Sequence, residues 1–382
     1  MKKPARLASG EVMAGGPILC LAPMADVTDA AFRHIIAKYS KFEGNLPSKL
    51  LNQKLGGYIT YTEFVSADGL ILAPEKGRKK LLKDLEYSEI ERPIVAQFFT
   101  SRPEIMEKVA ELAVLLGFDG IDINMGCPDK SIEKQGAGAA LIKNPPLARE
   151  LIKAAKRGVA EAAKRLNREE IPVSVKTRLG YNKDELETWL PLLLAENLAA
   201  IIIHARTREE MSKVSARWER IKRAVEIRDS YEADQKRFSQ KVLGSPVARL
   251  NQTFLENFSD PLTKTLIIGN GDVTDTDDAI KKCQETGADG AMLGRAIFGN
   301  PFLFSEQIPT NEEKIKVLLE HTKLFEEKFR GIKSFAVMKK HFKEYLKDLS
   351  VRDLRFKLMR ALNAEEVEET IEDYLPTLLS VK

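Results

Sequence analysis

The chain has 382 residues, of which 43% are hydrophobic and 30% charged, and these proportions exclude a disordered or fibrous protein. The formal net charge is only +4, so contact with a polyanion must depend on a local basic surface. Three cysteines without a CxxC spacing argue against a disulfide framework or a zinc cluster and predict a reducing cytoplasm. No run reaches the roughly 18 apolar residues of a membrane span, and the early glycines and prolines predict no signal peptide.

Eight short apolar runs recur along the chain, each bounded by turn residues and separated by amphipathic helical stretches. Parallel strands that are buried on both faces have this near-continuous apolar pattern. Eight strand–helix units in about 280 residues predict an α/β fold, a (β/α)8 or TIM barrel. A doubly wound sheet is the rival, but it usually carries a glycine-rich fingerprint after its first strand, where this chain has Pro23-Met24-Ala25. The predicted strands are residues 18–25, 59–66, 93–99, 120–125, 173–179, 200–206, 265–272 and 290–297.

Two segments exceed a minimal barrel, and the end of the chain changes character. Residues 41–57 and 228–264 are rich in polar or turn-forming residues, and we interpret both as surface insertions. After Phe302 only helical periodicity remains. We therefore predict a TIM-barrel domain over residues 1–302 and a C-terminal all-α domain over residues 303–382.

The cysteine of the segment 120–128 stands in a setting that favours chemistry. Ile121 and Ile123 alternate with Asp122 and Asn124 in a buried-strand pattern that runs directly into a Gly-Cys-Pro turn. Strand ends of α/β proteins direct side chains into a shared crevice. Most free cysteines are simply small buried hydrophobes. The polar, turn-forming neighbours of Cys127 favour a functional thiol instead.

Other strand ends carry residue types that suit a phosphate and a planar ring. Glycines and a cation follow strands 7 and 8 at 269–272 and 294–295, the recurrent phosphate site of these barrels. Lys176 lies within a Val-Ser-Val-Lys strand, where an unpaired ammonium is costly, and a reduced flavin ring would supply an anionic partner. Taken singly, these residues are also compatible with a tight turn, a surface arginine and a lysine that reaches the barrel mouth.

Two further patterns do not predict a site. Gly136-Ala-Gly138 resembles a dinucleotide fingerprint, but the third glycine is missing and a polar segment precedes it. The four histidines lie far apart in the sequence and have no metal-ligand spacing, so we expect no metal.

Taken together, the motifs resemble those of the tRNA-dihydrouridine synthases, flavin enzymes that reduce specific uridines of tRNA. The resemblance spans roughly residues 17–300, with a weaker echo at residues 339–341. The insertions depart from the typical member, so the subfamily and the target uridine stay open. The motifs are Leu21-Ala-Pro-Met-Ala25, Tyr61-Thr-Glu-Phe-Val-Ser-Ala-Asp-Gly69, Ile123-Asn-Met-Gly-Cys-Pro128, Val175-Lys-Thr-Arg178, His204-Ala-Arg-Thr207, Asn270-Gly-Asp272 and Gly294-Arg295.

The resemblance implies roles for individual residues. It implies NADPH as electron donor, Cys127 as the general acid, and Asn124 and Arg178 as contacts to the substrate uracil. Reduction of the uracil 5,6 double bond needs a hydride at C6 and a proton at C5, and a thiol with a pKa of about 8.5 holds that proton at neutral pH. The residues implied to bind FMN are Pro23, Met24, Ala25, Gln97, Lys176, His204, Asn270, Gly271, Asp272, Gly294 and Arg295.

A basic segment near the C-terminus is the candidate RNA-binding surface. Residues 328–360 hold eleven Lys and Arg against three Asp and Glu, an excess of eight positive charges. The interleaved aromatic residues are expected to form mostly core, with the lysines facing phosphates. By the resemblance, Lys339, Lys340 and His341 contact tRNA. We expect a monomeric cytoplasmic protein that has tRNA as its partner.

Two other functions are compatible with these residues. An FMN barrel reductase of a small pyrimidine, like the dihydroorotate dehydrogenases, would share the phosphate site and the flavin lysine but would lack the basic helical domain. A non-catalytic RNA-binding barrel would retain the fold without bound flavin.

Overall fold

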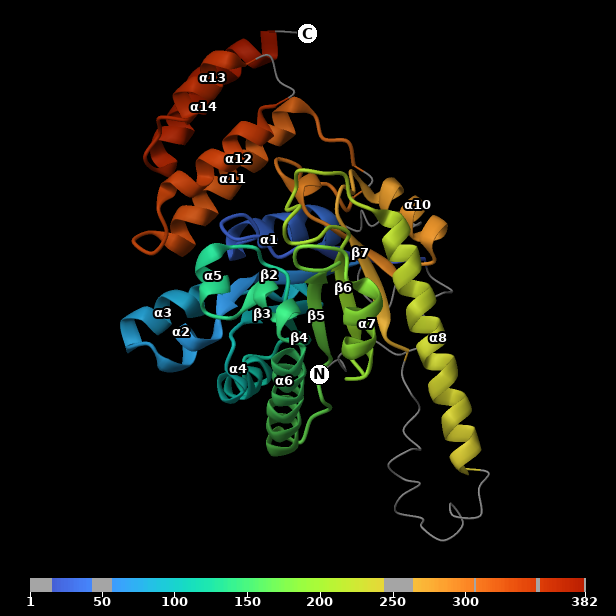
Figure 1. The fold of residues 1–382 in the computed structure, drawn as a ribbon. Coiled ribbons are helices and arrows are strands. Elements are labelled where there is room, and N and C mark those ends of the chain that lie inside the picture. The colour runs from blue at the N-terminus through green and yellow to red at the C-terminus, as the bar shows by residue number, and fades with distance from the viewer. Residues whose placement is uncertain (1–15, 43–56, 244–263, 306, 348–350, 381–382) are drawn as a thin grey trace.

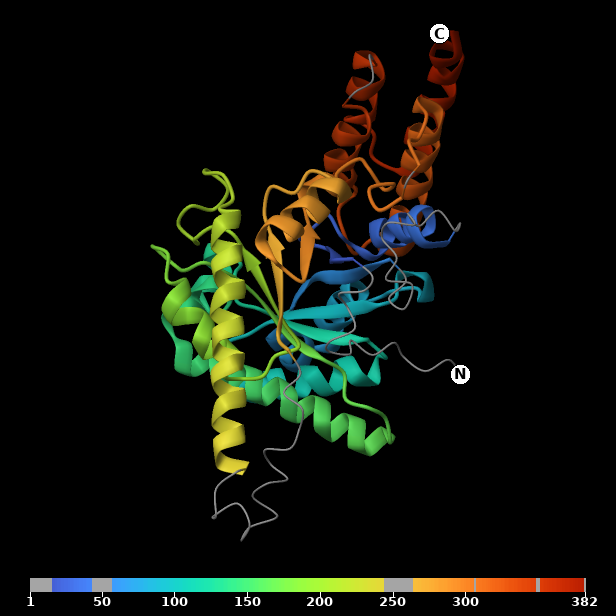
Figure 2. The ribbon, with the colours of Figure 1, turned by 90° about the vertical axis from the view of Figure 1, so that its right-hand side faces the viewer.

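Eight parallel strands form a closed barrel at the centre of the protein (Figures 1 and 2). The structure is a computed structural model that describes residues 16–42, 57–243, 264–305, 307–347 and 351–380. Each strand pairs with its neighbour in sequence, and β1 closes the barrel by pairing with β8. The TIM-barrel prediction is confirmed. The strands are β1 (Ile18–Leu21), β2 (Tyr58–Ser66), β3 (Ile94–Phe99), β4 (Gly120–Asn124), β5 (Val173–Arg178), β6 (Ala200–His204), β7 (Leu266–Asn270) and β8 (Gly290–Leu293).

All eight predicted strands exist, but several end earlier than predicted. The first run was predicted to reach residue 25, and the last one residue 297, whereas β1 ends at Leu21 and β8 at Leu293. The extra residues are the loops at the barrel mouth. Most of them, including Ala22, Pro23, Met24 and Ala296, line the cleft described below, so the run of small and apolar residues continues although the pairing of the strands has stopped.

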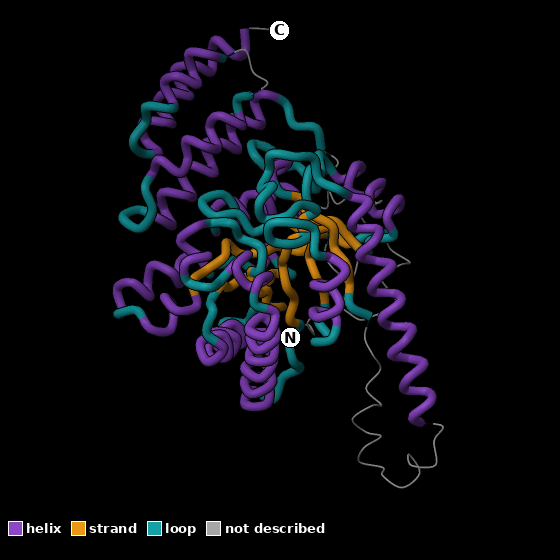
Figure 3. The backbone as a smooth tube through the Cα atoms, viewed as in Figure 1, coloured by secondary structure: helices purple, strands orange, loops and turns teal. Residues whose placement is uncertain are grey.

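Helices surround the barrel (Figure 3), and local signals account for several of their starts. The Asp29 carboxylate caps α1 by accepting hydrogen bonds from the backbone N–H groups of Ala31 and Phe32. Pro103 occupies the first turn of α4, where its missing N–H costs nothing. The helices are α1 (Ala30–Ala37), α2 (Ala67–Leu72), α3 (Glu75–Asp84), α4 (Pro103–Leu115), α5 (Lys130–Lys134), α6 (Pro145–Leu166), α7 (Leu186–Leu194), α8 (Trp218–Leu243) and α10 (Thr276–Thr286), with shorter helical turns η2 (Lys38–Phe42), η4 (Glu89–Glu91), η5 (Gly138–Lys143) and η7 (Arg295–Ile297).

The hydrophobic core has two layers. The larger one lies between the strands and the surrounding helices. The smaller one fills the barrel interior at the end where the strands begin, with Ile18, Cys20, Ile59 and Leu266 among its members. This inner layer closes one end of the barrel, so a ligand can enter only where the strands end.

The end of the chain is helical, as predicted. It forms α11 (Asn311–Phe329), η8 (Phe335–Val337), α12 (Met338–Tyr345), α13 (Arg352–Leu358) and α14 (Ala364–Ser380). These elements, orange to red in Figure 1, pack on the barrel through contacts between α1 and α11. Lys340 of α12 also forms an ion pair of 3.5 Å with Asp26, which belongs to the loop after β1. The helices therefore lie beside the open end of the barrel. The boundary between domains at residue 302 stays a prediction.

The two predicted insertions fall largely outside the described residues. Residues 43–56 and 244–263 are not described. Within 228–264, residues 228–243 continue α8, which begins at Trp218. The predicted insertion therefore starts inside a helix of the barrel. In the part of the chain that the structure describes, no helix is long and apolar enough to cross a membrane.

Candidate active site

The C-terminal ends of the strands surround a cleft of about 730 Å³, a size typical of a cofactor site. The residues that the resemblance assigns to catalysis, to FMN and to the uracil converge on this cleft with one exception. Ala25 is exposed and does not line it. The assigned residues that do line it are Pro23, Met24, Gln97, Asn124, Cys127, Lys176, Arg178, His204, Asn270, Gly271, Asp272, Gly294 and Arg295.

The loop after β4 holds Cys127 in a defined place. The Oδ1 atom of Asn124 accepts hydrogen bonds from the backbone N–H groups of Gly126 (3.2 Å) and Cys127 (2.9 Å). The Cys127 carbonyl accepts another from Ala139 of η5 (2.9 Å). Gly138 permits this approach, because a Cβ atom there would stand 2.8 Å from the Cys127 carbonyl oxygen, and its φ is +61°. Gly138 therefore supports the cysteine loop, and the segment at Gly136 and Gly138 follows α5 instead of a strand, so it is no dinucleotide fingerprint.

The environment of Cys127 keeps its thiol protonated. Burial raises the pKa of Cys127, and the nearby carboxylate of Asp129 acts in the same direction. The backbone N–H of Asp129 and the charges of Arg178 and Lys176 oppose this shift but do not reverse it. The side chain remains partly exposed to the cleft. Cys127 is therefore suited to donate a proton at neutral pH, and it lacks the low pKa of a nucleophilic cysteine.

Lys176 brings a positive charge to the floor of the cleft. Its Nζ donates a hydrogen bond of 3.0 Å to Oδ1 of Asn270, and the Asn270 amide in turn donates to the Met292 carbonyl (2.8 Å). Burial and the neighbouring Arg178 lower the pKa of Lys176 to about 8. An ammonium that is held by a neutral amide in such a place favours an anionic ligand.

A chain of contacts joins the loops after β6, β7 and β8. Arg206 donates to Nε2 of His204 (3.1 Å) and to Asp272 (2.5 Å), and Arg295 donates to the other Asp272 oxygen (2.6 Å). Because arginine only donates, His204 must accept through Nε2 and carry its proton on Nδ1. Burial, together with the surrounding cations, lowers the pKa of His204 well below its usual value, so the ring is neutral.

Arg206 has a place in this chain that the sequence pattern did not reveal. Its position at the end of the sixth strand was visible, but the motifs gave it no role. Its side chain is only 3% exposed and is committed to His204 and Asp272. Arg206 therefore holds the His204 ring and the Asp272 carboxylate in place at the edge of the cleft.

Arg178 does more than face the cleft. Its Nε donates to the Gly126 carbonyl (2.7 Å), and its Nη1 donates to the carbonyls of Thr207 (3.1 Å) and Met211 (3.3 Å). Burial lowers its pKa to about 10, so it stays charged at neutral pH. The guanidinium therefore joins the cysteine loop to the loop after β6, and its contact with a uracil stays a prediction.

The C-terminal helices correct two expectations about the basic segment. His341 is fully buried, with its ring 4.6 Å from the rings of Phe32 and His321, so it has no surface to offer RNA. Burial lowers its pKa to about 3, which keeps it neutral. Lys333, one of the eleven cations, is buried in ion pairs with Glu63 (2.6 Å) and Asp84 (2.9 Å). Lys340 is exposed and Lys339 half-buried, and both remain candidates.

The fold and the cleft together define the class of protein: a (β/α)8 barrel with a cationic cleft that carries a protonated thiol. Within the described ranges, no cluster of three or more His, Cys, Asp or Glu residues could hold a metal ion. The sequence model of the family described as dihydrouridine synthase matches residues 20–229 and 256–378. The chain therefore belongs to the dihydrouridine synthase family, a family of flavin-dependent oxidoreductases.

Individual proteins agree with this assignment. The chain is 33% identical to "Probable tRNA-dihydrouridine synthase 2" of Bacillus subtilis over 94% of each chain. It is 31% identical to "Probable tRNA-dihydrouridine synthase" of Staphylococcus aureus strain COL, over 94% of this chain and 93% of the other. Among solved structures, morphinone reductase covers 79% of this chain and 89% of its own with a TM-score of 0.43 and 12% identity. That likeness is too low to bear on function.

Proposed function

We propose that this protein reduces the 5,6 double bond of specific uridines in tRNA, with FMN as its cofactor and NADPH as the electron donor. The observation that carries the proposal is the cleft itself, where a protonated thiol and a buried ammonium face the same space. The names of the curated relatives support tRNA as the substrate. Such a substrate would place the enzyme in the cytoplasm.

The charges of the cleft fit FMN. Four cations line it, Lys176, Arg178, Arg206 and Arg295, and among the described lining residues Asp272 is the carboxylate that opposes them. This excess of positive charge favours a ligand with a phosphate and an anionic ring. Arg295 and the backbone at Gly271 and Gly294 would hold the phosphate, as the loops after strands 7 and 8 do in many barrels. Lys176 would face the pyrimidine part of the ring, where reduction places negative charge.

The protein's own part in the reaction is a proton transfer. The chemistry that FMN supplies when it is bound is hydride donation, here to C6 of the uracil. The Sγ–H of Cys127 then donates its proton to C5, which completes the saturated ring and leaves a thiolate that recovers a proton from solvent. Asn124 and Arg178 would orient the uracil beside the thiol. A thiol with a raised pKa is well matched to this role because it is protonated before each turnover.

The C-terminal helices would bind the folded tRNA. A uridine inside tRNA must leave its stack to enter a cleft of this kind. Lys339 and Lys340 lie on α12, next to the loop after β1 that forms part of the cleft rim. Further exposed cations would contact phosphates, namely Arg330, Lys343, Lys347, Arg352, Arg355, Lys357 and Arg360.

The test is direct. Purified protein is incubated with FMN, NADPH and unmodified tRNA, and the digested tRNA is analysed for dihydrouridine by mass spectrometry. The Cys127→Ala variant should lose about 10²-fold or more of the rate, the contribution of a positioned general acid, while its flavin absorbance stays that of the wild type. Cys283→Ala is the matched control, because that thiol is buried on α10 and does not line the cleft.

Three results would redirect the proposal. Full activity of Cys127→Ala would remove the assigned acid. Flavin binding without dihydrouridine, but with turnover of a free pyrimidine, would indicate a small-molecule reductase. Tight tRNA binding without any flavin would indicate a non-catalytic RNA-binding barrel.

A further inference from the structure

A buried carboxylate lies beneath the cleft and belongs to none of the roles above. Asp122 of β4 is fully buried inside the barrel. The register of the sheet places it beside Gln97 of β3 and Ser174 of β5. Gln97 lines the cleft, while Ser174 lines a separate small cavity of about 30 Å³ at the closed end. Asp122 therefore stands between the site and the apolar floor of the barrel.

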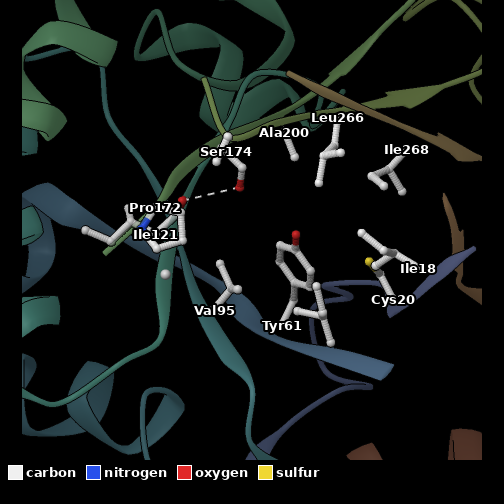
Figure 4. A pocket seen from close by; sticks show the side chains of 13 residues that line it. Ile18, Cys20, Tyr61, Val95, Ile121, Pro172, Ser174, Ala200, Leu266 and Ile268 are labelled. Carbon is white, nitrogen blue, oxygen red and sulfur yellow. Dashed lines mark hydrogen bonds between the residues drawn. The ribbon is translucent and has the colours of Figure 1, made fainter. Parts of the chain in front are cut away.

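Both oxygens of Asp122 accept short hydrogen bonds from neutral groups. Oδ2 accepts from Nε2 of Gln97 (2.6 Å), and Oδ1 accepts from Oγ of Ser174 (2.6 Å). The Tyr61 side chain and Ser174 both line the small cavity. Figure 4 shows the hydroxyl groups of Tyr61 and Ser174 pointing into the small cavity, Tyr61 from β2 and Ser174 from β5. An ionised carboxylate has no proton to give, so Gln97 and Ser174 must both act as donors toward Asp122.

The same direction of donation continues along a series of hydrogen bonds to the cysteine loop. Gln97 gives its Nε2 to Asp122, which leaves its Oε1 to accept from Nδ2 of Asn124 (3.0 Å). Asn124 then presents Oδ1 to the backbone N–H groups of Gly126 and Cys127. The chain thus runs from the Cys127 backbone through two amides to one carboxylate, with all donors aligned. A rotated amide at either position would set two N–H groups or two oxygens against each other.

We propose that Asp122 is a positioning residue, whose acceptor-only carboxylate fixes the orientation of the Gln97 and Asn124 amides and thereby holds the loop of Cys127. The inference deepens the proposed function, because it rests on Cys127 as the proton donor. It assigns Asp122 no contact with substrate or cofactor. Burial raises the pKa of Asp122 to about 6, which leaves it ionised at neutral pH. Lys176, the nearby cation, acts in the opposite direction and favours the charged form.

The first test separates the acceptor from the charge. Asp122→Leu removes both, whereas Asp122→Asn can still turn an oxygen to Gln97 and give its amide protons to Ser174. The readout is the rate at which iodoacetamide alkylates Cys127 in the FMN-loaded protein, located by peptide mass spectrometry. We expect Asp122→Leu to raise this rate about tenfold, the equivalent of one hydrogen bond to a charged group. Asp122→Asn and the control Ser174→Ala should stay close to the wild-type rate.

A rescue experiment keeps the proposal testable if Asp122→Leu does not fold. Gln97→Glu alone sets two carboxyl groups against each other and should raise the alkylation rate. Adding Asp122→Asn reverses the polarity at this step, because the carboxylate introduced at position 97 then accepts from both the amide introduced at position 122 and the amide of Asn124. We expect the double variant to recover the wild-type rate. A double variant no closer to wild type than the single one would overturn the proposal, as would an unchanged rate in folded Asp122→Leu.

The kinetic signature is a loss in kcat. The tRNA-binding surface lies on the C-terminal helices, so folded Asp122→Leu should lower kcat about tenfold and leave the KM for tRNA nearly unchanged. A rise in KM with unchanged kcat would contradict a role at the cysteine loop. The alkylation experiments need neither tRNA nor NADPH. They therefore give an answer even if the wild-type protein makes no dihydrouridine, so failure of the two proposals can be distinguished.

Discussion

Two buried carboxylates of this protein are satisfied in different ways. Asp122, under the cleft, accepts hydrogen bonds from the neutral side chains of Gln97 and Ser174. Glu63, beside the C-terminal helices, forms an ion pair of 2.6 Å with Lys333 and accepts from the backbone N–H of Asp26, also at 2.6 Å. Both are almost fully withdrawn from water. Burial raises the pKa of each carboxyl group. The ion pair with Lys333 opposes this rise at Glu63, whereas the hydrogen bonds from Ser174 and Gln97 oppose it at Asp122.

The difference follows from what each carboxylate joins. Asp122 lies within one sheet, where neighbouring strands already fix the distances, and neutral donors suffice to orient two amides. Glu63 and Lys333 are 270 residues apart in sequence and connect β2 to the segment after α11. A charge pair at such a junction has a strong penalty for separation, because each member would be left buried without its partner. Neutral donors orient the amides beneath the cysteine loop, and the Glu63–Lys333 ion pair attaches the segment after α11 to the barrel.

Breaking the ion pair between Glu63 and Lys333 should have the largest effect on stability. Lys333→Met leaves Glu63 and Asp84 buried without their cation, so we expect a loss of about 3–5 kcal/mol in the free energy of unfolding. Urea denaturation followed by circular dichroism measures it. Lys340→Met is the matched control: its pair with Asp26 is half exposed, so the loss there should be below about 1 kcal/mol. Equal losses in the two variants would contradict the comparison.

Asp122, which has only neutral hydrogen-bond donors as direct partners, should make the free energy of unfolding depend on pH. The pKa of Asp122 is raised from 3.8 to about 6, so the folded chain holds this proton more tightly than the unfolded chain does. Its contribution to stability is therefore full below about pH 4 and is lost as pH rises to 6, a change of roughly 3 kcal/mol. Asp122→Asn should lack that loss when urea denaturation is compared at pH 4 and pH 7.

A control variant tests whether this pH effect belongs to burial. Asp373→Asn replaces an exposed carboxylate of α14 and should leave the wild-type pH profile in place. The burial argument fails if Asp122→Asn follows the wild-type profile as well.

Lys176 extends the comparison to a buried cation that is held by a neutral amide. Its pKa is lowered to about 8, so it loses its charge above that pH when no anion is bound. FMN affinity of the apoprotein should then fall by up to about tenfold between pH 7 and pH 9. Fluorescence titration measures it. Lys176→Met should bind FMN more weakly and without this pH dependence, and a flat wild-type profile would argue against Lys176 as a charged contact of bound FMN.

The smallest effect is expected at Lys340, the exposed cation that pairs with Asp26. Lys340→Ala should raise the KM for tRNA about two- to threefold without changing kcat, and should reduce the salt slope of tRNA binding by about one. Lys153→Ala, on α6 of the barrel, is the matched control and should change neither value. A similar effect in both variants would place the RNA elsewhere.

The barrel and most of its cleft could be predicted because their signals are local. Short, near-continuous apolar runs bounded by turn residues indicate buried parallel strands, and eight such runs separated by helical stretches favour a closed barrel. The ends of parallel strands meet at one edge, so Cys127, Lys176 and Arg295 had to lie near one another once the fold was known. Ala25 shows the limit of this rule, since it follows two cleft residues but points to solvent.

The sequence by itself determined the strands, the convergence of their ends and the chemical types gathered there. Only the tertiary structure decided which partner each polar group has. Asp122 finds Gln97 and Ser174 at separations of 25 and 52 residues, and Lys333 and His341 turn inward although their basic surroundings suggested an RNA surface. The physical reason is that periodicity is a property of neighbours along the chain. The partner of a buried charge depends on strand register and on how the helices pack against the barrel.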